Sequence, residues 1–208
     1  MLSQVRPAVV LLALFTLLTG LAYPLAITGV AQLVMPYQAN GSVLQIGGKP
    51  VGSELIGQNF ASDKYFHGRP SATQAQDPAH PDDPSKTIDA PYNAANSTGS
   101  NLGPTSQKLL DRVKASVEAE RAAGLTGQVP ADSVTTSASG LDPHISPGNA
   151  LAQVATVAKA RNLPEDQVRA LVEAHIEGRV LGLIGEPRVN VLRLNLALDA
   201  LSAAQKSS

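Results

Sequence analysis

The sequence contains no cysteine and no tryptophan, and no phenylalanine or tyrosine follows Tyr92. The absence of cysteine excludes disulfides, cysteine-ligated zinc, iron–sulfur clusters and thiol catalysis. Charged residues make up only 16% of the chain, and 16 Lys and Arg nearly balance 17 Asp and Glu. Binding of nucleic acid requires clustered basic side chains or aromatic stacking platforms, so we expect no nucleic-acid partner.

One long stretch lacks charge altogether. No acidic or basic residue occurs between Arg6 and Lys49, and Pro7–Ala31 is a run of 25 uncharged, mainly apolar residues. As an α-helix this run would be about 37 Å long, enough to cross a bilayer core of about 30 Å. We therefore predict a transmembrane helix over residues 7–35. A signal peptide cleaved after Ala31, which would leave a secreted soluble binding protein, is the alternative, although the run is longer than the usual apolar region of such peptides.

The charges that flank this run predict its orientation. Arg6 and the terminal amine are the positive charges on the N-terminal side, and the next charge along the chain is Lys49. Positively charged flanks stay in the cytoplasm. We therefore expect residues 1–6 to be cytoplasmic and residues 36–208 to form a domain on the outer, periplasmic face.

The predicted helix carries no ionisable residue that could line an ion path. It does carry small residues at helical spacing, Thr16 with Gly20 and Ala22 with Ala26, where a second helix could pack closely. Pro24 would leave a backbone carbonyl that a neighbouring helix could satisfy. Two interpretations stay open: a passive tether, and a helix packed into a larger membrane assembly.

Beyond the membrane, two short apolar stretches flank a pair of glycines. Val43–Ile46 and Val51–Ile56, separated by Gly47-Gly48, predict a β-hairpin with a glycine turn. Lys49 after two glycines could suggest a phosphate-binding loop, but Pro50 follows it where such a loop requires Ser or Thr. We therefore expect a turn.

Residues 71–106 are rich in Pro, Asp, Asn, Ser, Ala and Gly and predict a long polar surface loop. Asp77, His80, Asp82 and Asp83 lie within it and could suggest a metal site. Their proline-rich setting offers no helix face and no supporting outer shell, so a solvated acidic loop is favoured.

The C-terminal half predicts helices. Helices are expected from Pro104 to Ala123, from the capping pair Ser146-Pro147 to Arg161, and from about Pro164 onward, with Val168, Leu171, Val172 and Ile176 buried. Val189–Leu201 fits both alternation and helical spacing, and we favour a strand that enters a short helix. The predicted fold class is α+β: a membrane helix followed by a single mixed domain with a hairpin, a long loop and C-terminal helices.

The segment TSASGLDPHISP brings Ser137, Ser139, Asp142 and His144 close in sequence, as a serine hydrolase would require in space. One residue separates Asp142 from His144, which disfavours the buried acid behind the histidine of a triad. The sequence also lacks the G-x-S-x-G elbow. We therefore favour a tight polar loop over a catalytic centre.

Several strings occur in a specific order: GLAYPLAITGVAQ, PYQANGSV, GSELIGQNF, YFHGRPSA, GSNLG, TSASGLDPHISP, VAKAR and VNVLRLNLALD. From about Arg6 to Leu201 the chain resembles the C chain of the bacterial potassium-transporting P-type ATPase, the KdpC family. The resemblance implies a single-pass inner-membrane subunit without catalytic activity. It also implies three partners: the channel-like KdpA, the ATP-hydrolysing KdpB and the very small KdpF. ATP, magnesium and potassium would bind at the partner subunits, and the chain would hold no cofactor of its own.

The family is described as a catalytic chaperone that raises the ATP affinity of the hydrolysing subunit, and the resemblance implies Gln153 as a nucleotide contact. The charge asymmetry instead places the domain away from cytoplasmic ATP and favours a structural role where potassium enters. The residues that we expect to contact partners lie in the predicted membrane helix and in the two most specific strings, YFHGRPSA and SASGLDPHISP. They are Gly20, Ala22, Pro24, Ala26, Tyr65, Phe66, His67, Arg69, Ser139, Gly140, Asp142 and His144.

Overall fold

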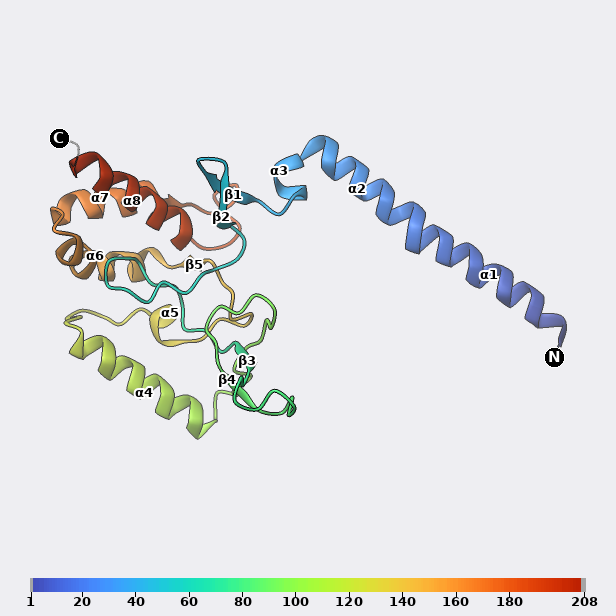
Figure 1. The fold of residues 1–208 in the computed structure, drawn as a ribbon, viewed down its shortest axis with the longest axis horizontal. Helices are drawn as coiled ribbons and strands as arrows, with labels where there is room; N and C mark the ends of the chain where they lie inside the picture. Colours follow the sequence, from blue (N-terminus) through green and yellow to red (C-terminus); the bar gives the residue numbers. More distant parts are fainter. Residues whose placement is uncertain (1, 207–208) are drawn as a thin grey trace. The chain divides into compact units, whose positions relative to one another are not determined.

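The computed structural model describes residues 2–206 and divides into two compact units, one ending at Ser53 and one beginning at Glu54. Figure 1 shows the elements of each unit. The first unit is an apolar helix followed by a short hairpin, and the second is an α+β lobe with its own hydrophobic core.

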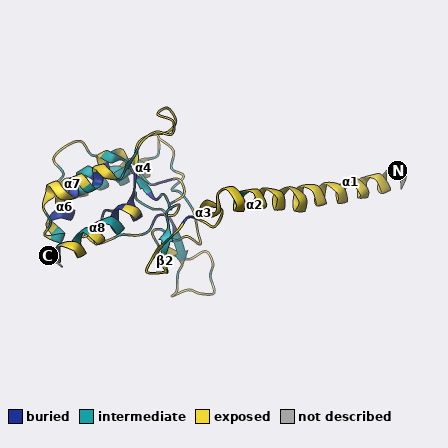
Figure 2. Ribbon diagram, turned by 90° about the horizontal axis from the view of Figure 1, so that it is seen from above, coloured by how far each residue is buried: buried dark blue, intermediate teal, exposed yellow. Residues whose placement is uncertain are grey.

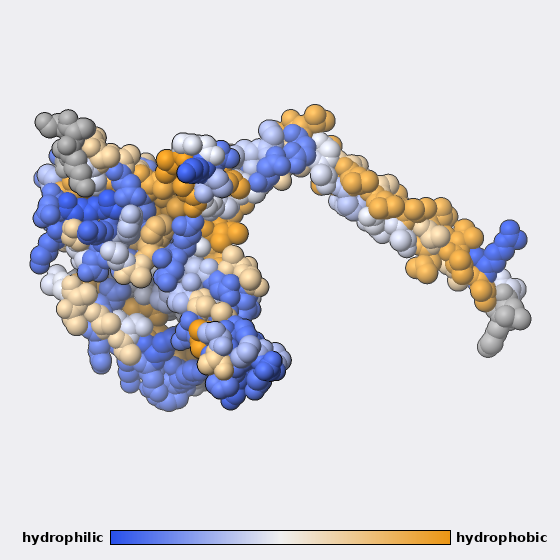
Figure 3. Space-filling view, in the orientation of Figure 1, coloured by the Kyte–Doolittle hydropathy of each residue, from blue (hydrophilic) through white to orange (hydrophobic). Residues whose placement is uncertain are grey.

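The apolar run forms the predicted helix. α1 (Val5–Leu17), a π-helical turn (Leu18–Ala22) and α2 (Tyr23–Val34) follow one another without a break, after a 3₁₀ turn at Leu2–Gln4. The helix Val5–Val34 has 30 residues and contains an 18-residue stretch with a mean hydropathy of 2.2, so it is long and apolar enough to cross a membrane. Apart from the half-buried Ala31 its residues are exposed, in yellow in Figure 2, and its surface is largely orange in Figure 3.

The π turn lies where Pro24 interrupts the hydrogen bonding. Proline has no N–H to donate, so the carbonyl one turn earlier loses its usual partner. Here the Tyr23 N–H donates to the Leu18 carbonyl, five residues back, and the Thr19 hydroxyl donates to the Phe15 carbonyl at 2.7 Å. The helix thus passes the proline by widening one turn. A Cβ added to Gly20, in the same turn, would meet no atom within 4 Å.

The hairpin confirms the glycine turn but shifts its second strand. After the short helix α3 (Pro36–Ala39), β1 (Val43–Ile46) pairs antiparallel with β2 (Lys49–Ser53). Gly47 and Gly48 have φ values of 57° and 77°, which two-residue hairpin turns require and glycine adopts without strain. The predicted strand Val51–Ile56 is wrong at both ends, because β2 begins at Lys49 and ends at Ser53.

The second unit contains a two-stranded sheet, a three-stranded sheet and five helices among the residues described. β5 (His144–Ile145), β7 (Arg188–Asn190) and β6 (Ile176–Glu177) form an antiparallel sheet in the order β5-β7-β6. The helices are α4 (Gln107–Ala122), α5 (Ala131–Val134), α6 (Pro147–Arg161), α7 (Glu165–Ala174) and α8 (Val191–Lys206). This mixture confirms the α+β class.

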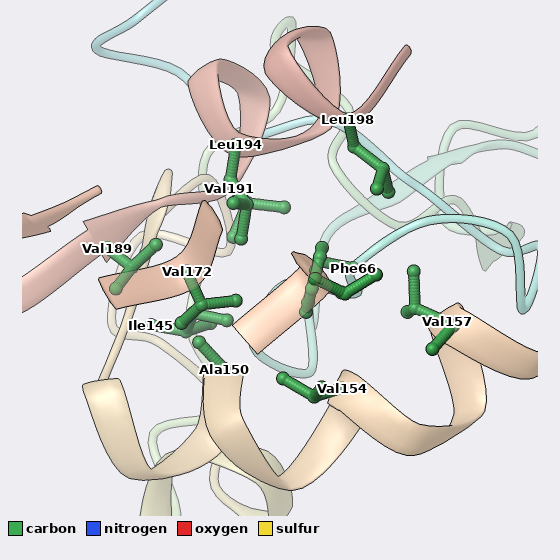
Figure 4. Close-up of a cluster of buried hydrophobic side chains, with 12 residues drawn as sticks. Phe66, Ile145, Ala150, Val154, Val157, Val172, Val189, Val191, Leu194 and Leu198 are labelled. Atoms are coloured by element: carbon green, nitrogen blue, oxygen red, sulfur yellow. The ribbon is translucent and has the colours of Figure 1, made fainter. Parts of the chain in front are cut away.

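The core of this lobe lies between α6, α7, α8 and the small sheet. Figure 4 shows valines of α6 and α7 facing leucines of α8, with the Phe66 ring among them. The buried cluster is Phe66, Ile145, Ala150, Val154, Val157, Ala158, Val168, Val172, Val189, Val191, Leu194 and Leu198. Phe66 belongs to no helix or strand, so an irregular segment supplies the largest side chain of the core.

The start of α6 confirms the predicted cap. The Ser146 hydroxyl accepts a hydrogen bond from the Asn149 N–H at 3.1 Å, and Pro147 occupies the first turn. Asp132 completes this end of the helix: its carboxylate accepts from the Ser146 N–H and hydroxyl at 2.7 and 2.8 Å and from the Asn149 amide at 3.1 Å. A residue fourteen positions upstream therefore fixes where α6 begins.

Three predictions need correction. Residues 71–106 are not merely a loop, because β3 (Gln74–Gln76) and β4 (Thr87–Asp89) pair within them. The helix predicted from Pro104 begins at Gln107 and leaves Leu110 exposed. The C-terminal strand is confirmed but its helix is not short, since α8 has 16 residues and carries all the alternating leucines. The strand ends at Asn190 because the buried face from Val191 onward follows helical spacing.

Candidate functional site

The segment Tyr65–Ser71 carries several of the predicted contact residues, and its backbone is held by side chains of α8 and α6. The Phe66 N–H donates to Asn195 Oδ1 at 2.8 Å, and Asn195 Nδ2 donates to the Phe66 carbonyl at 2.9 Å. Phe66 is fully buried and Asn195 is 1% exposed. Because an unpaired buried backbone group is costly, one carboxamide of α8 makes the burial of Phe66 possible.

Gln153 of α6 does the same for the next residue. The His67 N–H donates to Gln153 Oε1 at 2.7 Å, and Gln153 Nε2 donates to the His67 carbonyl at 3.2 Å and to Asn149 Oδ1 at 2.9 Å. Backbone groups of successive residues point in opposite directions in an extended chain, which is why two different helices serve Phe66 and His67. Both N–H groups of the Gln153 amide are used inside the protein.

Arg69 joins this segment to the second specific string. Its Nη1 lies 3.2 Å from Asp142 Oδ2, and both side chains are about one quarter exposed. The other oxygen of Asp142 accepts from the His144 N–H at 3.0 Å. Burial by itself would raise the pKa of Asp142, but hydrogen bonds from His144 and Arg69 outweigh it and hold this pKa below its ordinary value.

Ser71 and Gly140 continue the junction. The Ser71 hydroxyl donates to the Gly140 carbonyl at 2.8 Å, and the Ser137 N–H donates to the Pro70 carbonyl at 3.2 Å. Gly140 has a φ of 67°, and a Cβ there would lie 2.4 Å from the Thr73 methyl group. The two strings therefore pack against each other, and only glycine fits at their contact.

Tyr92, which belongs to the polar segment 71–106, also binds this junction. Its hydroxyl donates to the Arg69 carbonyl at 2.7 Å, and burial raises the pKa of this phenol to about 12. Added Cβ atoms at Gly57 and Gly68 would lie 2.4 and 2.2 Å from the Tyr92 side chain. The sequence analysis missed this role, although Tyr92 is the last aromatic residue of the chain and stands alone in a polar stretch.

Tyr65 occupies the outer end of the segment. The Arg161 guanidinium carbon lies 4.6 Å from the centre of the Tyr65 ring, and Arg161 Nη2 pairs with Asp199 at 2.8 Å. A cation over an aromatic face at this distance is an attractive arrangement. The end of α6 and the middle of α8 are thereby joined across Tyr65.

The serine hydrolase arrangement does not form. His144 Nδ1 lies 3.7 Å from Asp142 Oδ1, longer than a hydrogen bond, and Asp142 is engaged by Arg69. The Ser139 hydroxyl accepts from the Leu141 N–H at 3.1 Å, and Ser137 is 4% exposed. No hydrogen bond joins a serine hydroxyl to His144 in the described part of the chain.

The acidic residues of the long segment stabilise turns. Asp77 pairs with His80 at 2.8 Å, and Asp83 accepts from the hydroxyl and N–H of Ser85 at 2.6 and 3.0 Å. These bonds lower the pKa of both aspartates. Between residues 2 and 206, no group of three His, Asp or Glu side chains lies close enough to hold a metal ion.

The predicted contact residues thus fall into two sets. In the lobe, Arg69 binds Asp142 and Ser71 binds Gly140, whereas Tyr65, Phe66 and His67 are held by α6 and α8, and all these interactions are internal to the lobe. Gly20, Ala22, Pro24 and Ala26 lie in the apolar helix and are exposed. Asp132, Asn149 and Asn195, which the sequence analysis did not single out, complete the polar framework.

The described part of the chain has one helix fit to cross a membrane, followed by an α+β lobe whose polar side chains bind its own backbone. These two parts define the class: a protein with one candidate membrane anchor and one folded lobe. Residues 5–200 match the family described as K+-transporting ATPase, c chain, KdpC. Three curated proteins named potassium-transporting ATPase KdpC subunit are similar over nearly their full lengths. The relative from Bradyrhizobium diazoefficiens is 61% identical over 98% of this chain and 100% of its own length. Those from Methylobacterium nodulans and Rhodopseudomonas palustris are 63% and 62% identical, covering 97% and 96% of this chain and 99% and 98% of their own.

The chain therefore belongs to the KdpC family of potassium-transporting ATPase subunits. This confirms the resemblance and places the chain in potassium transport as an accessory component. The comparisons give no support to a hydrolase or a secreted binding protein.

Proposed function

We propose that this chain is a non-catalytic subunit of an ATP-driven potassium uptake complex, assembled with KdpA, KdpB and KdpF and anchored in the bacterial inner membrane by Val5–Val34. The observation that carries this proposal is the internal use of polar side chains at the specific strings. Asn195 and Gln153 bind the backbone of Phe66 and His67, and Arg69 binds Asp142. Such a lobe offers a fixed shape to partners rather than a reactive group.

Co-purification tests the assembly. A full-length chain with an affinity tag, expressed with its neighbouring genes, should retrieve a membrane complex whose ATP hydrolysis is stimulated by potassium. A chain recovered alone from detergent-solubilised membranes, under conditions that keep other membrane complexes intact, would contradict the proposal.

We further propose that the lobe lies on the periplasmic face, with residues 1–6 in the cytoplasm. The support is the positive charge at Arg6 and the absence of charge from Pro7 to Gly48. Protease added to intact spheroplasts should then degrade the lobe, whereas a cytoplasmic control protein stays intact. Protection of the lobe would reverse the orientation and bring it to the side where ATP is present.

We infer that Gln153 supports the lobe rather than nucleotide binding. Its amide already makes three hydrogen bonds inside the protein, so a nucleotide contact would compete with the His67 backbone. Gln153→Ala should lower the free energy of unfolding of the lobe by about 1–2 kcal/mol. It should leave the KM for ATP of the assembled complex unchanged well below the unfolding temperature.

Thr156→Ala, an exposed position on the same helix, provides the matched control and should change neither quantity. The two roles of Gln153 predict opposite results. A raised KM for ATP with unchanged unfolding in the Gln153→Ala complex would establish the nucleotide contact and remove the supporting role.

A further inference from the structure

The turn between β6 and β7 presents aliphatic side chains to the outside. Leu181 and Leu183 are 87% and 83% exposed, and Val180 and Ile184 are 59% and 65% exposed. Single exposed leucines are ordinary on protein surfaces, but four large aliphatic residues within five positions form a contiguous patch. Such patches mark surfaces that bind another apolar surface.

The turn is closed by its own hydrogen bonds. The Val180 N–H donates to the Ile184 carbonyl at 2.9 Å, and the Ile184 N–H donates to the Val180 carbonyl at 3.0 Å. Leu181 has a φ of 53°, a left-handed conformation that residues other than glycine seldom adopt. The leucines are therefore held outward by a defined turn.

This turn lies near the point where the lobe receives the chain from the apolar helix. The first residue of the lobe, Glu54, accepts a hydrogen bond from Asn190 Nδ2 at 2.8 Å through its carbonyl, and its carboxylate pairs with Arg193. Asn190 ends the strand that follows the turn, and the six peptide units from Ile184 to Asn190 span at most about 22 Å. With the Asn190 side chain and its hydrogen bond added, the end of the turn lies within about 30 Å of the lobe's attachment point at Glu54.

Two other exposed apolar residues of the lobe lie at its attachment point. Leu55 and Ile56, which follow Glu54 directly, are 58% and 39% exposed. Within the described part of the lobe, the other large exposed hydrophobic residues outside this region are Ile88 and Leu110. Exposed aliphatic surface is thus concentrated near the attachment point rather than spread over the lobe.

The charges beside the turn are paired. Arg179 lies 2.8 Å from Glu186, and Arg188 lies 3.0 Å from Glu177, so each pair joins the two arms of the hairpin. Paired charges cost less than isolated charges when they approach a medium of low dielectric constant. The turn can therefore approach an apolar phase without bringing an uncompensated charge with it.

The composition of the turn favours lipid over protein as its partner. Residues 176–190 contain no aromatic residue. Protein interfaces rely mainly on Trp, Tyr and Arg anchors and use leucine less often, whereas the strength of insertion at the lipid boundary scales with the buried apolar area that leucine supplies. A chain with its own membrane helix also keeps the bilayer within reach at high effective concentration.

We propose that the Val180–Ile184 turn inserts its leucine side chains into the boundary between headgroups and acyl chains of the bilayer that holds the apolar helix. This second contact would limit the tilting of the lobe on its linker. The inference rests on the proposed membrane anchoring by Val5–Val34.

The absence of cysteine makes a direct test possible, because a single introduced cysteine can carry an environment-sensitive fluorophore. We would label the full-length chain at Leu183→Cys and reconstitute it in vesicles of phosphatidylethanolamine and phosphatidylglycerol that contain a nitroxide-labelled phosphatidylcholine. Ala119→Cys on the exposed side of α4 is the aqueous control, and Leu14→Cys in the apolar helix is the membrane control. The label at Leu183→Cys should show a blue-shifted emission and lose intensity to a shallow nitroxide, while the label at Ala119→Cys stays unchanged.

Adding Leu181→Asp to the Leu183→Cys chain should abolish the blue shift and the quenching without altering the circular dichroism of the lobe. Equal, unshifted emission at Leu183→Cys and Ala119→Cys, with strong quenching at Leu14→Cys, would overturn the lipid contact, leave the anchor intact and point to a protein partner for the turn. Absence of quenching at Leu14→Cys would instead contradict the anchoring itself, and the inference would fall with it.

Discussion

The two sides of the lobe are held together by different interactions. Around α6, α7 and α8, buried valines and leucines pack against one another, as in an ordinary hydrophobic core. Around Tyr65–Ser71, Tyr92 and Ser137–His144, the chain is irregular, and side chains bind backbone groups instead. A stretch with few apolar residues can therefore adopt one conformation when each backbone group receives a polar partner.

Phe66 connects the two sides. Its ring lies in the apolar core shown in Figure 4, while its backbone is bound by the buried Asn195. If this comparison is correct, deleting a buried apolar side chain around α6, α7 and α8 should lower the free energy of unfolding most. Deleting a polar side chain that binds backbone groups on the irregular side should lower it by an amount that increases with the burial of that side chain.

Leu194→Ala should have the largest effect, because Leu194 is fully buried among the helices. Deleting its side chain leaves a cavity and should lower the free energy of unfolding by about 2–5 kcal/mol. Urea titration followed by circular dichroism measures the loss. Leu183→Ala, at an 83% exposed leucine, is the control and should change stability by less than about 0.5 kcal/mol. Similar values for both would contradict the position of the core.

Asn195→Ala should follow closely. It leaves the buried N–H and carbonyl of Phe66 without their partner, at a cost of about 2–4 kcal/mol. The same urea titration gives the difference from the unsubstituted chain. Gln107→Ala removes an exposed carboxamide on α4 and should be nearly neutral. If Asn195→Ala is also neutral, polar partners do not stabilise this side of the lobe.

Tyr92 predicts an alkaline instability. The folded-state pKa is raised to about 12 from an ordinary value of 10.0, so the unfolded chain loses its proton first as the pH rises. The stabilisation is complete below pH 10 and is lost between pH 10 and 12, by about 3 kcal/mol. Comparing unfolding of the unsubstituted chain and Tyr92→Phe across this range isolates the effect. Parallel pH profiles for the two would show that Tyr92 is not buried as described.

Asp142 should produce the smallest effect, on the acid side. Its folded pKa lies below the ordinary value of 3.8, so its stabilisation is present above that value and is lost as the pH falls through the folded pKa. Because Arg69 and Asp142 are partly exposed, the loss should not exceed about 1 kcal/mol. Asp142→Asn should flatten this part of the acid titration, and an unchanged acid profile would exclude the ion pair as a contributor.

Local features of the molecule followed directly from the sequence. The uncharged run became the helix Val5–Val34, Gly47-Gly48 formed the hairpin turn, and Ser146-Pro147 opened α6. Each of these depends on residues within a few positions of one another, where propensity, capping and glycine conformations act without help from distant parts of the chain. The family resemblance rested on strings of the same local kind.

Contacts between residues far apart in the sequence could not be predicted from such local patterns. Asn195 binds Phe66 across 129 positions, Gln153 binds His67 across 86, and Arg69 meets Asp142 across 73. A carboxamide in a helix and a glycine in a serine-rich string carry no sign of their partners, because burial of the backbone they serve exists only after the chain has folded. The sequence by itself determined the apolar helix, the hairpin turn, the start of α6 and the family. The tertiary structure decided that the specific strings bind each other, since only the folded chain brings their donors and acceptors within hydrogen-bonding distance.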